Sequence, residues 1–189
     1  MILPKNNESE IKRRIFFALW PNEKVRLKIF EAYNNSGFSQ LDGREFKLDN
    51  LHLTLYFLGN VTNEQFDSAL NAAAKIEFKA FDLTLDYFDI FKKPKVLWMG
   101  CSVLPSALAS LYENLGRVLS EYDFVLDSRT FTPHVTLMRK LKQYEFDITP
   151  PVINWRVNEF GLIESVVSEN AVTYKPIKFF SCSAVQGGL

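Results

Sequence analysis

Two short phrases of the sequence contain both of its histidines. Residues 52–55 read HLTL and residues 134–137 read HVTL, so each histidine is followed by a threonine two positions later. A single histidine and threonine at this spacing is weak evidence for a site. A repetition that uses both histidines of a 189-residue chain indicates that the two phrases share one function.

The alternation of side chains along a β-strand determines how each phrase would present its residues. His52 and Thr54 would point to one face, and His134 and Thr136 would do the same in their own strand. The apolar residues between them would anchor each strand from behind. Two such strands facing one cleft would bring together two imidazoles and two hydroxyls.

Hydrolysis of a phosphodiester uses such a set of groups. A neutral imidazole takes a proton from water, and a protonated one gives a proton to the leaving oxygen. Histidine can hold either state near neutral pH because its ordinary pKa is about 6.5. The hydroxyls can hydrogen-bond the non-bridging phosphate oxygens, where charge develops. Two imidazoles in different protonation states predict a bell-shaped pH profile.

Rival chemistries have less support in the sequence. Two histidines could bind zinc, but the chain contains no HExxH or HxH pattern, and threonine is a poor zinc ligand. Ser102 and Cys101 lie in no motif of a nucleophilic enzyme. We therefore expect a site with neither a metal nor a cofactor.

Composition limits the class of protein. Hydrophobic residues make up 47% of the chain and charged residues 23%, which is enough for a packed core in one large domain or two small lobes. Lys and Arg together number 22, as do Asp and Glu. The chain therefore lacks the overall positive charge that is typical of proteins that bind long nucleic acids. A short or terminal nucleotide substrate would not need such a field.

Three features favour a cytoplasmic protein that does not enter a membrane. Cys101 and Cys182 show no CxxC spacing and are expected to be reduced thiols. The first 14 residues contain no apolar segment of a signal peptide. No window approaches 18 uninterrupted apolar residues, so we expect no membrane-spanning segment.

Hydrophobic periodicity predicts helices alternating with a larger number of strands. The helices are expected over residues 22–36, 62–76 and 105–120, the second opened by a capping box at Thr62 and Gln65. The strands are expected over residues 15–19, 44–48, 51–59, 78–91, 95–103, 134–140, 154–165 and 172–183. Pro150 and Pro151 place a loop before the strand at 154–165.

The two halves of the chain have similar contents. Each half offers strands, a helix and a strand with a histidine phrase, and the histidines are 134 − 52 = 82 residues apart. Two similar lobes related by a pseudo-twofold axis would explain this order. Mixed strands and helices in this order predict an α+β protein with antiparallel sheets.

Four stretches of the sequence resemble a known family. They are "RRIFFALWPNEKV" from Arg13, "NLHLTLYFLGNV" from Asn50, "KPKVLWMG" from Lys93 and "FTPHVTLMRK" from Phe131. The two histidine phrases are similar to the paired HxTx motifs of the 2H phosphoesterases. The framing residues resemble the branch called RNA 2′,3′-cyclic phosphodiesterase, also known as 2′-5′ RNA ligase-like, over most of the chain up to Phe180.

This resemblance implies a fold and an activity. The fold would be a single bilobal α+β domain over residues 1–189, with two antiparallel sheets flanking a central cleft and helices on the outer faces. We expect residues 1–12 to be a flexible N-terminal tail, because they lie outside the resemblance. The activity would be metal-independent hydrolysis of RNA 2′,3′-cyclic phosphate ends to 2′-phosphates, and the reverse 2′-5′ joining is known for the family. The partners would be RNA 3′ ends or small cyclic nucleotides, with no obligate protein partner.

The resemblance also implies roles for individual residues. His52 and His134 would be the catalytic acid and base, with His134 activating water and His52 protonating the leaving 3′ oxygen. Thr54 and Thr136 would bind the phosphate. Arg139 matches an arginine after the second motif that contacts phosphate or ribose.

Two aromatic residues after the first motif could stack on the terminal base. Phe57 matches an aromatic of the family, whereas Tyr56 stands where a small residue is common. Strand alternation places Tyr56 on the histidine side, and it places Phe57 and Arg139 on the opposite side unless the strands end or bend. A core phenylalanine and a solvated surface arginine are therefore the competing interpretations.

Other functions stay open at this point. The same chemistry could act on another cyclic phosphate or on a 2′-5′-linked nucleotide. The cleft could also bind RNA ends without turnover, although binding alone needs no pair of histidines.

Overall fold

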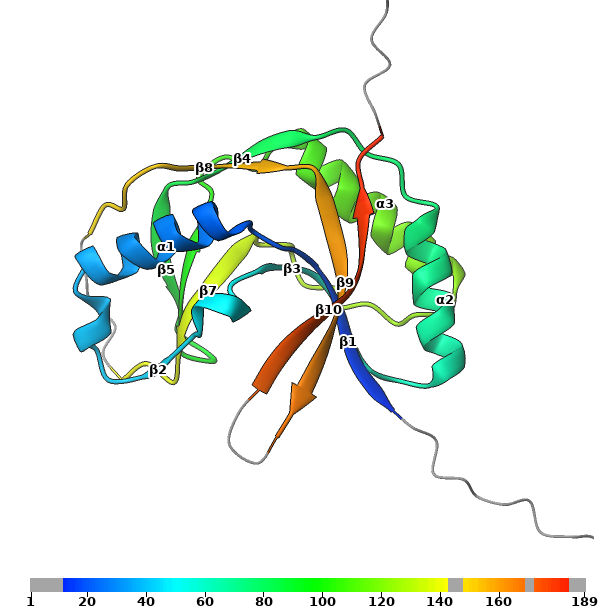
Figure 1. Ribbon diagram of the computed structural model, residues 1–189, viewed down its shortest axis with the longest axis horizontal. Coiled ribbons are helices and arrows are strands. Elements are labelled where there is room, and N and C mark those ends of the chain that lie inside the picture. Colours follow the sequence, from blue (N-terminus) through cyan, green and yellow to red (C-terminus); the bar gives the residue numbers. More distant parts are fainter. Residues whose placement is uncertain (1–11, 143–147, 169–171, 184–189) are drawn as a thin grey trace, which may run out of the picture.

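The computed structural model describes residues 12–142, 148–168 and 172–183. Within them the protein has the expected α+β fold with antiparallel sheets (Figure 1). The larger, eight-stranded sheet has the order β10-β9-β1-β3-β7-β6-β5, with β2 paired to β7, and β4 and β8 form a separate two-stranded sheet. The tail expected over residues 1–12 lies outside the described residues except for Lys12.

The elements follow the chain in an order close to the expected one. The helices are α1 (Glu23–Asn35), α2 (Asn63–Ala74) and α3 (Ser106–Glu121). The strands are β1 (Arg13–Leu19), β2 (Arg44–Glu45), β3 (Leu53–Val61), β4 (Phe81–Leu85), β5 (Tyr87–Phe91), β6 (Val96–Gly100), β7 (His134–Arg139), β8 (Ile153–Val157), β9 (Glu159–Val167) and β10 (Val172–Ser181). Two short 3₁₀ helices, η1 (Phe38–Gln40) and η2 (Leu48–Asn50), precede β3.

The two strands that carry the histidine phrases are neighbours in the larger sheet. β3 and β7 run antiparallel, and among the described residues they join through one pair, Leu53 opposite Val135. The two sheets are thus unequal in size, and both motif strands belong to the larger one. This pair joins the group of strands β10-β9-β1-β3 to the group β7-β6-β5.

The helices lie on two sides of this junction (Figure 1). α1 lies on one side, and α2 and α3 pack together on the other. The Asn22 side chain caps α1 by accepting from the Val25 amide at 3.0 Å. The capping box expected at Thr62 and Gln65 is confirmed at the start of α2. In the described part of the chain, no helix has the length and apolarity needed to cross a membrane.

Some predicted strands are broken or shortened. The strand expected over residues 78–91 divides at Asp86 into β4, which pairs with β8, and β5, which pairs with β6. The strand expected over residues 154–165 divides in the same way at Asn158. Hydrophobic periodicity reports which side chains are buried and not which partner strand takes each segment, so it does not locate these breaks. The strand expected at 44–48 is shortened to β2.

Candidate active site

Both motif histidines are oriented by a backbone carbonyl two residues before them. The Nδ1 atom of His52 lies 2.6 Å from the Asn50 carbonyl oxygen, and that of His134 lies 2.7 Å from the Thr132 oxygen. A carbonyl oxygen can only accept, so each Nδ1 carries a proton and donates it. The Nε2 atom of each neutral ring is then the one that can take or give a proton in a reaction.

The pairing of β3 with β7 places the two motifs side by side. Leu53 lies opposite Val135, and both side chains are fully buried. Continuing this antiparallel register by one residue sets His52 beside Thr136 and Thr54 beside His134. The structure therefore brings the four motif residues together, with each histidine next to the threonine of the other motif.

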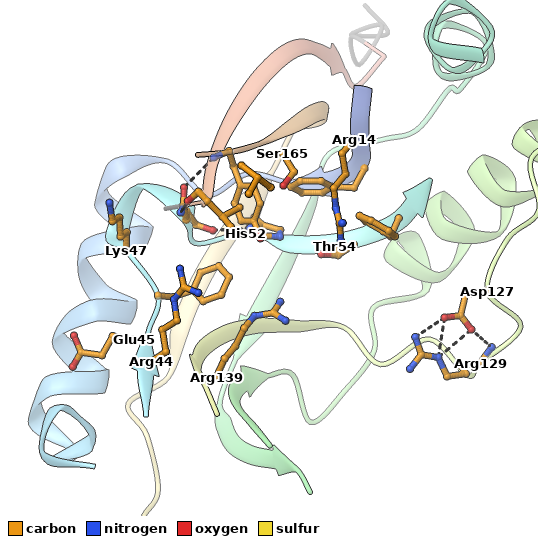
Figure 2. Close-up of a pocket in the computed structure, with 17 residues that line it drawn as sticks. Arg14, Arg44, Glu45, Lys47, His52, Thr54, Asp127, Arg129, Arg139 and Ser165 are labelled. Carbon is orange, nitrogen blue, oxygen red and sulfur yellow. Dashed lines mark hydrogen bonds and ion pairs between the residues drawn. The ribbon is translucent and has the colours of Figure 1, made fainter. Parts of the chain in front are cut away.

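A cavity of about 800 Å³ opens over the first of these motifs. His52, Thr54 and Arg139 line it (Figure 2). Phe57 also belongs to its lining. His134 and Thr136 are not among its lining residues. His134 packs instead against Phe91 and Trp98, with ring centroids 4.9 and 5.7 Å away.

A β-bulge in β3 brings Phe57 to the cavity. Phe17 of β1 pairs with Tyr56 and Ala18 pairs with Thr54, which leaves Leu55 as an extra residue in β3. One extra residue reverses the alternation of side chains beyond it. The expectation that Phe57 faces away from the histidines is therefore wrong. Its side chain is 49% exposed, and the Arg14 guanidinium lies 4.8 Å from its ring centroid.

A matching bulge in β7 acts on Arg139. Leu97 of β6 pairs with Met138 and Trp98 pairs with Thr136, so Leu137 is the extra residue. Leu137 and Met138 are both buried, and Arg139 returns to the side of His52. The expectation that Arg139 faces away from the histidines is therefore wrong, although its side chain is exposed, as expected of a surface arginine. Both motifs thus place their fifth residue after the histidine in the cavity.

The same bulge removes Tyr56 from the site. Tyr56 is 8% exposed and stacks on Tyr112 of α3, with centroids 4.3 Å apart and planes 11° apart. Gly116 leaves room for the Tyr56 ring, because a Cβ at this position would collide with it. The predicted place of Tyr56 on the histidine side is wrong, and the residue belongs to the core.

Aromatic side chains enclose His52. The ring centroids of Phe16, Trp20 and Tyr174 lie 4.9, 5.7 and 5.0 Å from that of the imidazole. Burial lowers the pKa of His52 to about 4, although the hydrogen bond to Asn50 acts in the opposite direction. The positive charge of Arg139 lowers this pKa further.

His134 is less enclosed than His52. Burial also lowers the pKa of His134, against the effect of the Thr132 carbonyl, and Arg139 contributes in the same direction as burial. The site therefore favours neutral imidazoles while it is empty of anions. A bound phosphate would favour their protonated forms.

Comparison with known proteins fits this geometry. The family model described as the 2′-5′ RNA ligase superfamily matches residues 23–169. The chain belongs to the 2′-5′ RNA ligase superfamily. The family resemblance expected from the two histidine phrases is thereby confirmed.

Several members of the superfamily align over nearly the whole chain. The RNA 2′,3′-cyclic phosphodiesterase of Escherichia coli strain K12 is 33% identical over 168 residues, which cover 88% of this chain and 94% of that protein. A protein of the same name from Thermotoga maritima is 30% identical, over 93% of this chain and 97% of its own. The crystal structure of E. coli LigT with 3′-AMP superposes with a TM-score of 0.85 at 29% identity. That match covers 92% of this chain and 99% of LigT.

In this superfamily member, Asn50 has a role that the sequence did not reveal. Its side chain is buried, donates to the Val172 carbonyl at 3.1 Å and accepts from the Tyr174 amide at 3.3 Å. Its own carbonyl orients His52. Asn50 thus ties β10 to the first histidine. The sequence does not mark this position by repetition, because the residue two places before His134 is Thr132 and not a second asparagine.

Positive charge surrounds the cavity, although the chain as a whole is neutral. The basic side chains that line it are those of Arg14, Arg44, Lys47, Arg129 and Arg139 (Figure 2). Asp127 and Glu45 are the acidic residues among its lining, and Asp127 forms an ion pair with Arg129. Apart from Arg139, no motif marks these residues in the sequence, because they lie on segments far apart in the chain.

The donor set around the histidines does not resemble a metal centre. Over residues 12–142, 148–168 and 172–183, no three or more His, Cys, Asp or Glu side chains gather in a group that could hold a metal ion. The groups nearest to the histidines are hydroxyls, aromatic rings and a guanidinium. These groups suit the binding of a phosphate rather than of a cation.

Proposed function

We propose that this protein hydrolyses 2′,3′-cyclic phosphate ends of RNA to 2′-phosphates by a two-histidine acid/base mechanism. The observation that carries the proposal is the pair Leu53 and Val135, which sets two oriented imidazoles on neighbouring strands. The cyclic phosphodiesterases of E. coli and T. maritima, aligned over most of the chain, support the choice of substrate.

The reaction uses each motif residue once. Nε2 of His134 takes a proton from water, and the water oxygen attacks phosphorus. The bond from phosphorus to the 3′ oxygen breaks, and that oxygen takes a proton from Nε2 of His52. The product carries a 2′-phosphate and a 3′ hydroxyl. Thr54 and Thr136 donate hydrogen bonds to the non-bridging oxygens, and Arg139 offsets their negative charge.

The burial of His52 places a condition on this mechanism. A pKa of about 4 means that His52 is neutral near pH 7 in the ligand-free protein. His52 therefore gains its proton in the complex, where the negative charge of the substrate favours the imidazolium. The same charge makes His134 a stronger base. Binding of the phosphate thus prepares both groups for the reaction.

One assay tests the proposed function. An RNA oligomer with a 2′,3′-cyclic phosphate end is incubated with the protein in EDTA, and the position of the phosphate in the product is assigned. We expect complete conversion to the 2′-phosphate. Tight binding without turnover would instead support an RNA-end binder. Turnover only of other cyclic phosphates, or of 2′-5′-linked nucleotides, in a parallel panel would reject RNA ends as the substrate.

A second assay tests the roles of the two histidines. Replacing the 3′ bridging oxygen by sulfur gives a leaving group that needs no proton. We expect His52→Ala to hydrolyse this substrate at nearly the wild-type rate, while His134→Ala stays slow. Recovery of His134→Ala instead would exchange the two roles.

The cytoplasmic location, the single-domain organisation and the reverse 2′-5′ joining belong to this proposal as expectations.

A further inference from the structure

A cluster of three basic side chains, Arg44, Lys47 and Arg139, lines the cavity beside His52. Arg44 of β2 lies directly opposite Arg139 of β7. Like charges at opposed positions of an antiparallel pair destabilise it. Lys47, just before η2, lines the same cavity. Across the described residues, no acidic side chain forms an ion pair with any of these three residues.

The two acidic side chains that line the cavity have their own hydrogen-bond or ion-pair partners. The Glu45 carboxylate accepts the hydroxyl of Tyr33 on α1 at 2.8 Å. Asp127 forms an ion pair with Arg129, away from Arg44 and Lys47 (Figure 2). Among the described residues, this side of the cavity therefore carries the three positive charges of Arg44, Lys47 and Arg139 against the one carboxylate of Glu45, an excess that suits an anionic ligand.

The position of the cluster fits the shape of a nucleotide. In Figure 2, Arg44 and Lys47 project on one side of His52, whereas Arg14 lies on the other side. Arg14 is stacked with Phe57, the residue expected to hold the terminal base. In a ribose, the base and the 5′ group leave from opposite sides of the edge that carries the 2′,3′-cyclic phosphate. A base on Phe57 therefore directs the preceding nucleotides toward Arg44 and Lys47.

We infer that Arg44 and Lys47 bind the phosphodiester groups of the nucleotides that precede the cyclic end. The inference rests on the proposed function and adds a substrate preference to it. A single-stranded RNA oligomer is a better substrate than a cyclic mononucleotide, because only the oligomer brings phosphates to this cluster. Because both side chains are exposed, their contacts depend strongly on salt.

The test compares substrates of increasing length that share one terminal nucleotide. The ratio of kcat/KM for an oligomer to kcat/KM for the cyclic mononucleotide is measured for the wild type and for Arg44→Gln/Lys47→Gln. We expect the double substitution to lower this ratio roughly tenfold, as for two exposed charge-assisted contacts. The matched control is Lys24→Gln/Lys28→Gln, which removes the same charge from the exposed face of α1 and should leave the ratio unchanged.

A binding measurement gives a second readout that does not need turnover. The affinity for an RNA oligomer ending in a 2′-phosphate is followed as a function of salt. The loss of two phosphate contacts should reduce the slope of log affinity against log salt by about 1.4. The control variant should keep the wild-type slope.

The outcomes separate this inference from the proposed function. Equal kcat/KM for oligomer and mononucleotide in the wild type overturns the inference and leaves the proposed function intact. An unchanged length ratio and salt slope in Arg44→Gln/Lys47→Gln overturns it as well. Absence of turnover on every cyclic substrate rejects the proposed function, and the inference that rests on it.

Discussion

Leu53 and Val135 lie opposite each other across β3 and β7, and neither side chain is exposed. Each is the apolar residue inside a histidine phrase, so one buried pair fixes the position of both motifs. The free energy that holds the site together comes from burial of these side chains in the core and not from contacts between the histidines themselves. The two histidines are therefore available for the proposed acid/base role without having to hold the two strands together.

Titration of the histidines by NMR tests the electrostatics of the site. Because the chain has only two histidines, two imidazole signals are expected. We predict a pKa near 4 for His52 and a pKa below 6.5 for His134, since burial disfavours both imidazolium forms. Addition of a nucleoside 2′-phosphate should raise both values. Two unperturbed titrations near pH 6.5 would contradict the predicted effect of burial.

The low pKa of His52 also predicts how stability depends on pH. The unfolded chain protonates this histidine near pH 6.5, whereas the folded protein does so only near pH 4. The free energy of unfolding should therefore fall as the pH drops from 6.5 to 4, by up to about 3 kcal/mol. His52→Gln, measured by urea unfolding at each pH, should show a weaker fall. Equal slopes for variant and wild type would be evidence against the shift.

Substitution of two adjacent aromatic residues should affect different properties, substrate binding for Phe57 and stability for Tyr56. Phe57→Ala removes a half-exposed ring from the cavity, so we expect KM to rise by about one order of magnitude, as for the loss of one stacked base. The free energy of unfolding should change by less than about 1 kcal/mol. Tyr56→Ala removes a buried ring stacked on Tyr112 and should cost about 3–5 kcal/mol of stability.

Steady-state kinetics and urea unfolding of the two variants distinguish these roles. Tyr56→Ala should keep the wild-type KM under conditions where it is folded. An unchanged KM in Phe57→Ala would remove Phe57 from the substrate site. A raised KM with full stability in Tyr56→Ala would show that Tyr56 contacts substrate after all.

Asn50 offers a test of how His52 is positioned. Asn50→Ala removes the two hydrogen bonds to β10 while keeping the carbonyl that accepts from His52. We expect kcat to fall roughly tenfold to a hundredfold, because a small displacement of a catalytic group has a large effect on rate. The pKa of His52 measured by NMR should also change in this variant. Asn154→Ala, which removes an exposed amide bonded to Thr84, is the matched control and should change neither quantity.

The pattern of the sequence was sufficient for the three helices, for most strands and for the two motif phrases. It was insufficient for the breaks at Asp86 and Asn158 and for the faces of the residues that follow the motifs. Alternation correctly gave the orientation of Thr54 from that of His52. It failed at Tyr56 and Phe57 because the bulge at Leu55 depends on the pairing with β1, which no local pattern encodes. The bulge at Leu137 has the same origin in β6. The basic cluster at Arg44 and Lys47 depends on tertiary contacts in the same way.

The central claim is that His52 and His134, one from each half of the chain, act in a single reaction. The most direct measurement is the single-turnover rate of His52→Ala and of His134→Ala on one RNA 2′,3′-cyclic phosphate substrate, with binding of the 2′-phosphate product measured alongside. We predict that each variant still binds product and loses about 10²-fold to 10⁴-fold in rate. A rate near that of the wild type in either variant would contradict the two-histidine site.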